Sequence, residues 1–382
     1  MSASLVLRTL ERLQRGRLEV SLPGGRRHAF GEAHVPAVDL EVRSLGAFTR
    51  VLRAGDIGFA EGYLEGEWTT SHLPRLLTLL AANREPLEKP LYGGVLGRLL
   101  YRLLDLARAN TRAGSRRNIA AHYDLGNEFY ALWLDRGMTY SSALFAGDTG
   151  RSLEDAQHAK LARALERLAP GGEGRVLEIG CGWGSFAELA ADRGLRVTGL
   201  TLSREQLAYA RARLGARADL QLRDYRDERG RYDAVASIEM IEAVGERWWP
   251  AYFGKIAEVL PRRGRALVQA IVIDDALFAR YRRGSDFIRR YVFPGGMLPS
   301  PARLAEQAGR AGLEVAESFS FGPDYARTLA LWRSRFLARW PEARALGYDE
   351  RFRRMWEFYL AYCEAGFTAG STDVVQVVLE KR

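Results

Sequence analysis

The run Val176–Gly184, V-L-E-I-G-C-G-W-G, restricts the possible folds more than any other part of the sequence. An apolar strand leads directly into glycines at alternate positions, and a helical stretch follows. Such glycines allow a tight turn and let a ligand approach the bare backbone. Strand-like runs at 176–179, 196–202, 220–225, 232–238 and 265–273 alternate with helical runs at 152–168, 184–193, 204–214 and 248–260. This alternation predicts a doubly wound α/β fold with a parallel sheet, a helical insertion over about 275–310 and an edge strand over 374–380.

The acid before the glycines indicates the ligand. Glu178 lies two residues before Gly180, and Gly182 and Gly184 complete an E-x-G-x-G-x-G pattern. A carboxylate here repels a pyrophosphate but suits an ammonium or sulfonium group. The pattern is therefore typical of a loop that binds S-adenosylmethionine (SAM) rather than a dinucleotide.

The next two strands end in polar residues that would reach the same ligand. Thr201 and Gln206 follow the second strand, near the place where such folds usually hold the ribose hydroxyls. Asp224 and Tyr225 end the third strand, where we expect the partner of the adenine amino group.

Two carboxylates, Glu239 and Glu242, follow the fourth strand. In an open α/β sheet, chemistry takes place at the carboxyl ends of the strands. Glu239 fits either a second site carboxylate or a charge at a helix N-terminus, and the sequence alone leaves both interpretations open.

The chain divides into three parts. Residues 1–85 mix short strand-like runs with turns and a helical run, which predicts a small α+β domain. Residues 86–117 form a helical connector whose leucines gather on one face; this face would pack on the protein or lie on an anionic membrane. Residues 118–382 carry the α/β pattern.

Composition excludes several classes of protein. The 382 residues are 47% hydrophobic and include two cysteines and five histidines, too few and too scattered for a disulfide scaffold or a zinc cluster. The sequence shows neither a signal-peptide pattern nor a long apolar span, so we expect a cytoplasmic protein.

The net charge is +9, and all but four of the 56 Lys and Arg residues are arginines. This balance fits an anionic partner, either nucleic acid or phospholipid, or simply an arginine-rich surface.

Long motifs over nearly the whole chain resemble the cyclopropane-fatty-acyl-phospholipid synthases and the related mycolic-acid methyltransferases. Besides the glycine loop they are H-Y-D-L-G-N-E-F-Y (122–130), M-T-Y-S-S-A-L-F (138–145), S-I-E-M-I-E-A-V-G (237–245), R-Y-V-F-P-G-G-M-L-P-S (290–300) and F-G-P-D-Y-A-R-T-L-A-L-W (321–332). The resemblance implies a seven-stranded, Rossmann-like, SAM-dependent methyltransferase domain behind a lipid-carrier-like N-terminal domain. It also implies a homodimer docked peripherally on the inner membrane.

The resemblance further implies a mechanism. The cis double bond of an unsaturated phospholipid acyl chain attacks the SAM methyl group, and the carbocation that forms loses a proton and closes a cyclopropane ring. In the family the base is taken to be a bound bicarbonate ion. By motif, Tyr140 and Ser141 would join the cofactor residues, and the bicarbonate pocket would use Ser142, Glu242, Gln269, Ile271 and Tyr325.

Three positions depart from the best-known members of the family. Ser142 stands in place of a cysteine, and Ala243 and Gln269 stand in place of histidines. The cysteine contributes a backbone N–H, so serine preserves that contact. Gln269 can donate an amide hydrogen bond but cannot titrate. These departures bear on the reaction outcome more than on the cofactor.

Other outcomes stay open. A hydride shift before proton loss gives a methylene-branched chain, which a reductase partner would convert into a methyl branch. Relatives with this activity are similar at E-M-I-E-A-V-G and at Gln269. The other classes are a small-molecule N-methyltransferase, an RNA methyltransferase and a lipid carrier with a vestigial cofactor site. No RNA-binding module is recognisable, so we expect no nucleic-acid partner.

The insertion carries a basic cluster that suggests a membrane contact. Its members surround Phe287 and are Arg282, Arg283, Arg289 and Arg290. We expect them to meet phospholipid headgroups, with a solvated helix face as the alternative.

Overall fold

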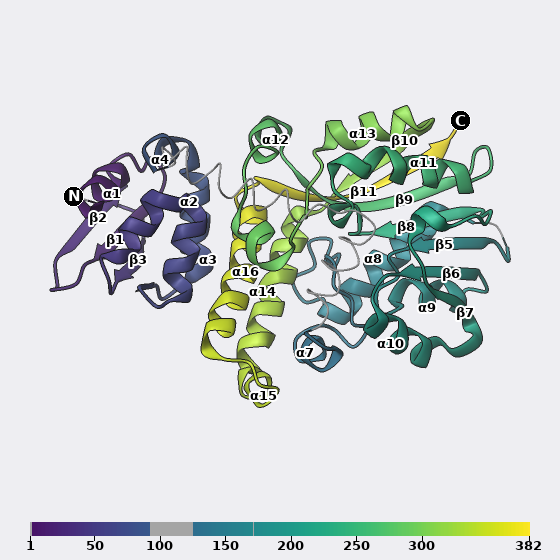
Figure 1. The fold of residues 1–382 in the computed structure, drawn as a ribbon, viewed down its shortest axis with the longest axis horizontal. Coiled ribbons are helices and arrows are strands. Elements are labelled where there is room, and N and C mark those ends of the chain that lie inside the picture. Colours follow the sequence, from purple (N-terminus) through teal and green to yellow (C-terminus); the bar gives the residue numbers. More distant parts are fainter. Residues whose placement is uncertain (1, 92–124, 171) are drawn as a thin grey trace.

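The computed structural model describes residues 2–91, 125–170 and 172–382, and its larger part is built on a seven-stranded sheet (Figure 1). The strands are β5 (Arg175–Ile179), β6 (Arg196–Thr201), β7 (Ala218–Leu222), β8 (Ala234–Ile238), β9 (Arg265–Ile273), β10 (Leu313–Ser320) and β11 (Thr372–Lys381). Their order is β10-β11-β9-β8-β5-β6-β7. Strands β5 to β9 pair in parallel, and β11 is antiparallel to both neighbours. The predicted doubly wound, seven-stranded α/β fold is confirmed.

Two helical layers cover the sheet. One consists of α8 (Leu153–Leu168), α9 (Ser185–Asp192) and α10 (Arg204–Leu214), and the other of α11 (Trp249–Val259), α12 (Asp275–Tyr281) and α13 (Pro301–Arg310). In the central strand β5, Val176 packs under the first layer, whereas Leu177 and Ile179 pack under the second. Successive strand residues point to opposite faces, so one apolar run fills both cores.

The edge of the sheet differs from the prediction. The run 374–380 was expected at the edge, but β11 lies between β9 and β10. Its central residues are buried, because neighbours flank it on both sides, and this explains the nearly continuous apolar sequence V-V-Q-V-V-L. The edge strand is β10, L-E-V-A-E-S-F-S, which is largely exposed and has too weak an apolar pattern to be noticed in the sequence.

Helices beyond the sheet form a second, aromatic core. The segment between β10 and β11 folds into α14 (Gly322–Ala338), α15 (Trp340–Ala345) and α16 (Glu350–Thr368), and the short α7 (Asn127–Ala131) packs against them. Edge-to-face contacts join Trp133 to Trp332 and Trp356, and join Trp356 to Phe129. In Figure 1, α14 and α16 lie between the sheet and the N-terminal domain.

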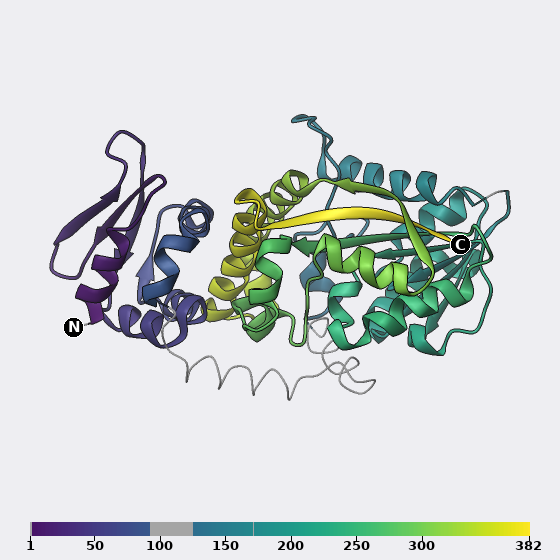
Figure 2. The same cartoon turned by 90° about the horizontal axis from the view of Figure 1, so that it is seen from above.

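The N-terminal part forms the expected small α+β domain. Its strands β1 (Arg17–Ser21), β2 (Arg27–Gly31), β3 (Ala37–Val42) and β4 (Trp68–Thr69) form a sheet of order β2-β1-β3-β4. Its helices are α1 (Ser2–Leu10), α2 (Gly46–Leu64), α3 (Leu73–Ala82) and α4 (Arg84–Leu91). The domain packs on α16 in both views (Figures 1 and 2), where the Tyr63 hydroxyl donates to Glu357 at 3.0 Å and Arg354 donates to the Tyr63 carbonyl at 2.7 Å.

The connector predicted over 86–117 lies mostly outside the described residues. Within the described ranges, no helix combines the length and the apolar character needed to cross a membrane.

Candidate active site

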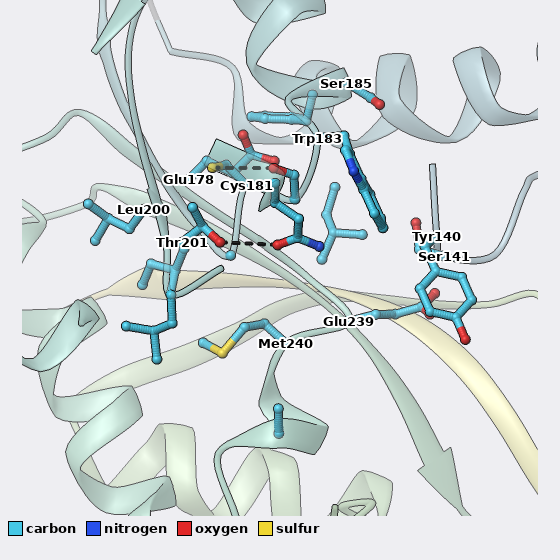
Figure 3. A pocket seen from close by; sticks show the side chains of 18 of the residues that line it. Tyr140, Ser141, Glu178, Cys181, Trp183, Ser185, Leu200, Thr201, Glu239 and Met240 are labelled. Carbon is cyan, nitrogen blue, oxygen red and sulfur yellow. Dashed lines mark hydrogen bonds between the residues drawn. The ribbon is translucent and has the colours of Figure 1, made fainter. Parts of the chain in front are cut away.

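A pocket opens at the carboxyl ends of β5, β6 and β8 (Figure 3). Open α/β sheets bind their ligands at this edge. Leu200 and Thr201 lie at one end of the pocket, and Tyr140, Ser141 and Glu239 lie at the other. The predicted cofactor residues that line it are Tyr140, Ser141, Glu178, Gly180, Gly182, Thr201, Gln206, Asp224 and Tyr225.

The remaining predicted residue, Gly184, has a different role from Gly182. Both have a left-handed backbone, with φ of +90° and +51°. A Cβ atom on Gly182 would meet nothing within 4 Å, so its backbone is open to a ligand. A Cβ on Gly184 would lie 2.6 Å from Leu214 and 3.3 Å from Ala210 of α10. Gly184 therefore permits close packing of α9 against α10 rather than ligand contact.

A buried acid and a buried lysine flank the glycine loop. Glu178 is 3% exposed, and Lys160 from α8 is 0% exposed. Burial raises the pKa of Glu178 well above its ordinary value, and the nearby charge of Lys160 opposes that rise. Within the described chain, Oε2 of Glu178 is buried without a hydrogen-bond partner, so it is available to an ammonium group. The sequence analysis missed Lys160, although Ala156 and Ala164 on the same helical face mark its position as buried.

The Thr201 end of the pocket carries a polar pair. The Thr201 hydroxyl donates to Oε1 of Gln206 at 3.1 Å, as drawn in Figure 3. Ser203 caps α10 by accepting from the Gln206 N–H at 3.2 Å. These contacts fix the two side chains at the place where we expected the ribose hydroxyls.

Asp224 and Tyr225 begin the short turn that follows β7. The Asp224 carboxylate accepts from Nε of Arg226 at 2.8 Å and from its terminal nitrogen at 2.5 Å. A forked arginine–carboxylate pair is rigid, so Arg226 fixes Asp224 on the pocket wall. Oδ1 of Asp224 also accepts the backbone N–H of Arg226 at 3.0 Å. The sequence analysis did not identify Arg226.

The loop that contains Tyr140 and Ser141 closes the opposite end of the pocket. Two side chains of α8 hold it: Gln157 donates to the Ser141 carbonyl at 2.8 Å, and Lys160 donates to the Ser141 hydroxyl at 2.6 Å. The hydroxyls of Tyr140 and Tyr359 share a 2.7 Å hydrogen bond. The predicted cofactor residues Tyr140 and Ser141 are thus positioned from α16 and α8.

Glu239 stands at this end and accepts three hydrogen bonds. The N–H of Ser142 and Nε2 of Gln269 donate to its Oε1 at 2.8 Å and 2.7 Å, and the Tyr325 hydroxyl donates to its Oε2 at 2.7 Å. Its backbone φ of +50° is uncommon for a residue other than glycine. Burial raises the pKa of Glu239 above its ordinary value, and the three donors and the charge of Lys160 oppose that rise.

A chain of hydrogen bonds fixes the direction of the Gln269 amide. Arg163 can only donate, and it donates to Oε1 of Gln376 at 2.5 Å. Nε2 of Gln376 therefore donates to Oε1 of Gln269 at 3.0 Å. The NH2 group of Gln269 is consequently turned toward Glu239.

Glu242 lies apart from these donors. Its Oε1 accepts the N–H of Ile271 at 2.6 Å, and its Oε2 is buried without a partner among the described residues. Burial, together with the charge of nearby Glu239, raises the pKa of Glu242 to about 8. Glu242 is therefore mainly neutral at pH 7.

The predicted bicarbonate pocket is divided between two glutamates. Ser142, Gln269 and Tyr325 converge as expected, but they converge on Glu239, whereas Ile271 contacts Glu242. Ser142 takes part through its backbone N–H, as expected. The geometry makes Glu239 a site carboxylate rather than a helix charge.

A cluster of aromatic rings extends from Tyr140, which lines this end of the pocket. The ring centre of Tyr140 lies 5.4 Å from that of Trp332 and 6.5 Å from that of Phe293. Trp332 also lies 6.1 Å from Tyr325, and Phe293 lies 6.0 Å from Tyr359. The faces of such rings attract a positive charge.

Comparison with known proteins identifies the family. The sequence model described as "Mycolic acid cyclopropane synthetase" matches residues 110–377. The chain belongs to this family. It is 40% identical over 371 residues to the tuberculostearic acid methyltransferase UfaA1 of Mycobacterium tuberculosis, covering 92% of this chain and 85% of the relative. It is 34% identical over 353 residues to the cyclopropane-fatty-acyl-phospholipid synthase of Escherichia coli K12, covering 90% and 88%.

A solved structure of the family gives the same result. The mycolic acid cyclopropane synthase CmaA1, crystallised with SAH and CTAB, superposes with a TM-score of 0.66 at 31% identity, over 70% of this chain and 98% of that one. The chain is thus a SAM-dependent methyltransferase of the cyclopropane synthase type. The unpartnered oxygen of Glu178 and the open backbone at Gly182 fit the ammonium group and the body of SAM.

Proposed function

We propose that this protein methylates the cis double bond of an unsaturated phospholipid acyl chain and then removes a proton from the added methyl group. The observation that carries this proposal is the Glu239 carboxylate, held by three donors at the aromatic end of the SAM pocket. A transfer to a heteroatom needs no base aimed at the transferred carbon. A transfer to an alkene leaves a cation that must lose a proton.

SAM, when bound, supplies an electrophilic methyl group. Glu178 would hold its ammonium group, Thr201 and Gln206 its ribose, and Asp224 its adenine. With these contacts made at one end of the pocket, Tyr140 and Glu239 at the other end would face the group that is transferred.

The aromatic cluster around Tyr140 would receive the acyl chain. The alkene π electrons form the new C–C bond as the C–S bond breaks, and the positive charge passes to the neighbouring chain carbon. The rings of Tyr140, Trp332 and Phe293 would stabilise this charge and exclude water that would otherwise trap it as an alcohol.

For the product we favour a methylene-branched chain, which a reductase partner would reduce to a methyl branch. The relative named a tuberculostearic acid methyltransferase, matched over 92% of this chain, favours this outcome. A cyclopropane ring is the second candidate, favoured by the description of the family and by the Escherichia coli relative. Both products require loss of a proton from the added methyl carbon, so both use the same base.

Docking on a phospholipid surface is part of the proposal. Arg282 and Arg283 are exposed at the end of α12, although Arg282 also pairs with Glu246 at 2.6 Å. Arg289 is half-buried. Phe287, which lies between Arg283 and Arg289 in the sequence, is buried in the core. The contact with headgroups would therefore rest on Arg282 and Arg283 rather than on the whole predicted cluster.

The test uses purified protein, SAM and vesicles of dioleoyl-phosphatidylglycerol, with mass spectrometry of the recovered lipid. We expect acyl chains heavier by one CH2 unit. A product that still takes up hydrogen over a catalyst carries a methylene group, whereas one that resists and fragments as a ring is a cyclopropane. Methylation of small amines in place of the lipid would refute the proposal.

A further inference from the structure

The three donors that the family resemblance assigns to a bicarbonate ion are already engaged by the protein. Ser142 has one backbone N–H, Tyr325 has one hydroxyl proton, and both are donated to Glu239. The Gln269 amide is aimed at the same carboxylate and is held in that direction by Gln376. A bound bicarbonate would need these same donors, so the residues present do not fit the ion.

The carboxylate has the right shape to replace the ion. Carboxylate and bicarbonate both present two oxygens, joined to one trigonal carbon, to surrounding donors. In Figure 3, Glu239 enters the pocket beside Tyr140 and Ser141. Its uncommon backbone conformation is locked by the hydrogen bond from its own N–H to the Gln269 carbonyl at 2.8 Å. Strained backbone of this kind persists where the surroundings over-determine it, commonly at active sites.

Glu242, the neighbouring glutamate, does not compete with Glu239 for the proton of the added methyl group. Glu242 holds the N–H of Ile271, and its second oxygen is buried with no partner in the described part of the chain. Glu239, by contrast, accepts from three donors, and hydrogen bonds donated to a carboxylate favour its charged form.

We propose that Glu239 is the catalytic base and that this enzyme works without bicarbonate. The inference rests on the proposed function, because it concerns the base of that same reaction. The carboxylate takes a proton from the newly added methyl carbon. The electrons of that C–H bond form either the third bond of the ring or, after a hydride shift, the π bond of the methylene group. Glu239 becomes a neutral acid, and its proton passes to water once the product leaves.

The experiment measures lipid methylation in CO2-depleted buffer, with and without added bicarbonate, for the wild type and two variants. We expect the wild-type rate to be the same with and without bicarbonate. Glu239→Gln keeps the shape but loses the base, so its rate should fall at least about 100-fold, the usual scale for a general base. The affinity of this variant for SAM, measured by calorimetry, should remain unchanged.

Glu239→Gly suits the left-handed backbone and leaves the three donors around a carboxylate-sized space. Added bicarbonate or formate should restore its rate at least about tenfold, which is part of the roughly 100-fold or larger effect of a general base.

Glu228→Gln provides a matched control. Glu228 is another buried glutamate that does not itself line the pocket. It accepts from the backbone N–H groups of Arg229 and Gly230 and from the Tyr232 hydroxyl, and it pairs with Arg223 at 3.0 Å. We expect this variant to retain most of the activity. A wild-type enzyme that needs bicarbonate, or a Glu239→Gln variant that keeps its rate, would overturn the inference while the proposed function stands. A wild type that binds SAM but methylates no unsaturated lipid would overturn the proposed function and the inference together.

Discussion

The Gln269 amide donates to the Glu239 carboxylate at 2.7 Å, and the Glu239 N–H donates back to the Gln269 carbonyl at 2.8 Å. The sheet itself creates this reciprocal pair, because Ile238 at the end of β8 lies opposite Gln269 on β9. This register places the residue that follows Ile238 beside the glutamine. The Gln269 side chain, which cannot titrate, thus positions the Glu239 carboxylate, which can.

Replacing Gln269 should weaken catalysis without affecting cofactor binding. In Gln269→Leu the carboxylate loses a donor, and a hydrogen bond to a charged group contributes about 1.5–3 kcal/mol. We expect kcat on vesicles to fall by about 10- to 100-fold, while the SAM Kd measured by calorimetry is unchanged. An unaltered kcat would mean that Gln269 does not position the base.

Two glycines of the same loop should respond differently to alanine. Gly182→Ala introduces a methyl group into the open pocket, and we expect weaker SAM binding. Gly184→Ala forces a contact with Leu214 and Ala210, and overpacking of this kind costs about 1–3 kcal/mol of unfolding free energy. Calorimetric Kd and thermal unfolding of both variants separate the two effects, since both replacements also strain a left-handed backbone. Equal losses of affinity would contradict the distinction drawn between the two glycines.

Glu242 should make stability fall as pH rises. Its pKa is raised from an ordinary value of 4.5 to about 8 in the folded protein, so between these values unfolding releases a proton. The contribution is complete below pH 4.5 and is lost as pH rises toward 8, by at most about 1.4 kcal/mol for each pH unit. Glu242→Gln stays neutral at every pH and should not show this slope.

Denaturant unfolding of the wild type and Glu242→Gln at several pH values provides the check. The difference between the two free energies of unfolding should shift in favour of the variant as pH rises from about 5 to 8. Parallel curves would show that the carboxyl group of Glu242 titrates normally.

Charge reversal at the end of α12 should affect activity only on anionic lipid. The double variant Arg282→Glu/Arg283→Glu replaces two exposed positive charges, and we expect slower methylation of phosphatidylglycerol vesicles at low salt with unchanged SAM affinity. The matched control is Arg196→Glu/Arg310→Glu, whose side chains are 70% and 67% exposed and belong to the start of β6 and the end of α13. A similar loss of activity in the control would indicate a general effect of net charge.

The sequence allowed the architecture to be predicted because each α/β unit carries its own local signal. The apolar runs of β5 to β9 and the helices between them were placed to within a few residues. The exception is instructive: β11 was predicted at the edge and β10 was missed, since strand order depends on long-range pairing that no local pattern records.

The lining of the pocket was predictable for a similar reason, but the convergence of Ser142, Gln269 and Tyr325 on Glu239 was not. Gly180, Gly182 and Glu178 belong to one contiguous motif at the end of one strand. Which of two glutamates, three residues apart, turns toward Ser142 depends on a left-handed backbone at Glu239, and a residue other than glycine gives no sign of that conformation. Lys160 was detectable from helical periodicity, as a charge on an otherwise apolar face.

Lipid analysis of a host that makes monounsaturated phospholipids, with and without this protein, tests the central claim most directly. We expect acyl chains that are one CH2 unit heavier when the wild-type protein is present, and far fewer of them with Glu239→Gln. Unchanged lipids in cells that contain folded, SAM-binding wild-type protein would contradict it.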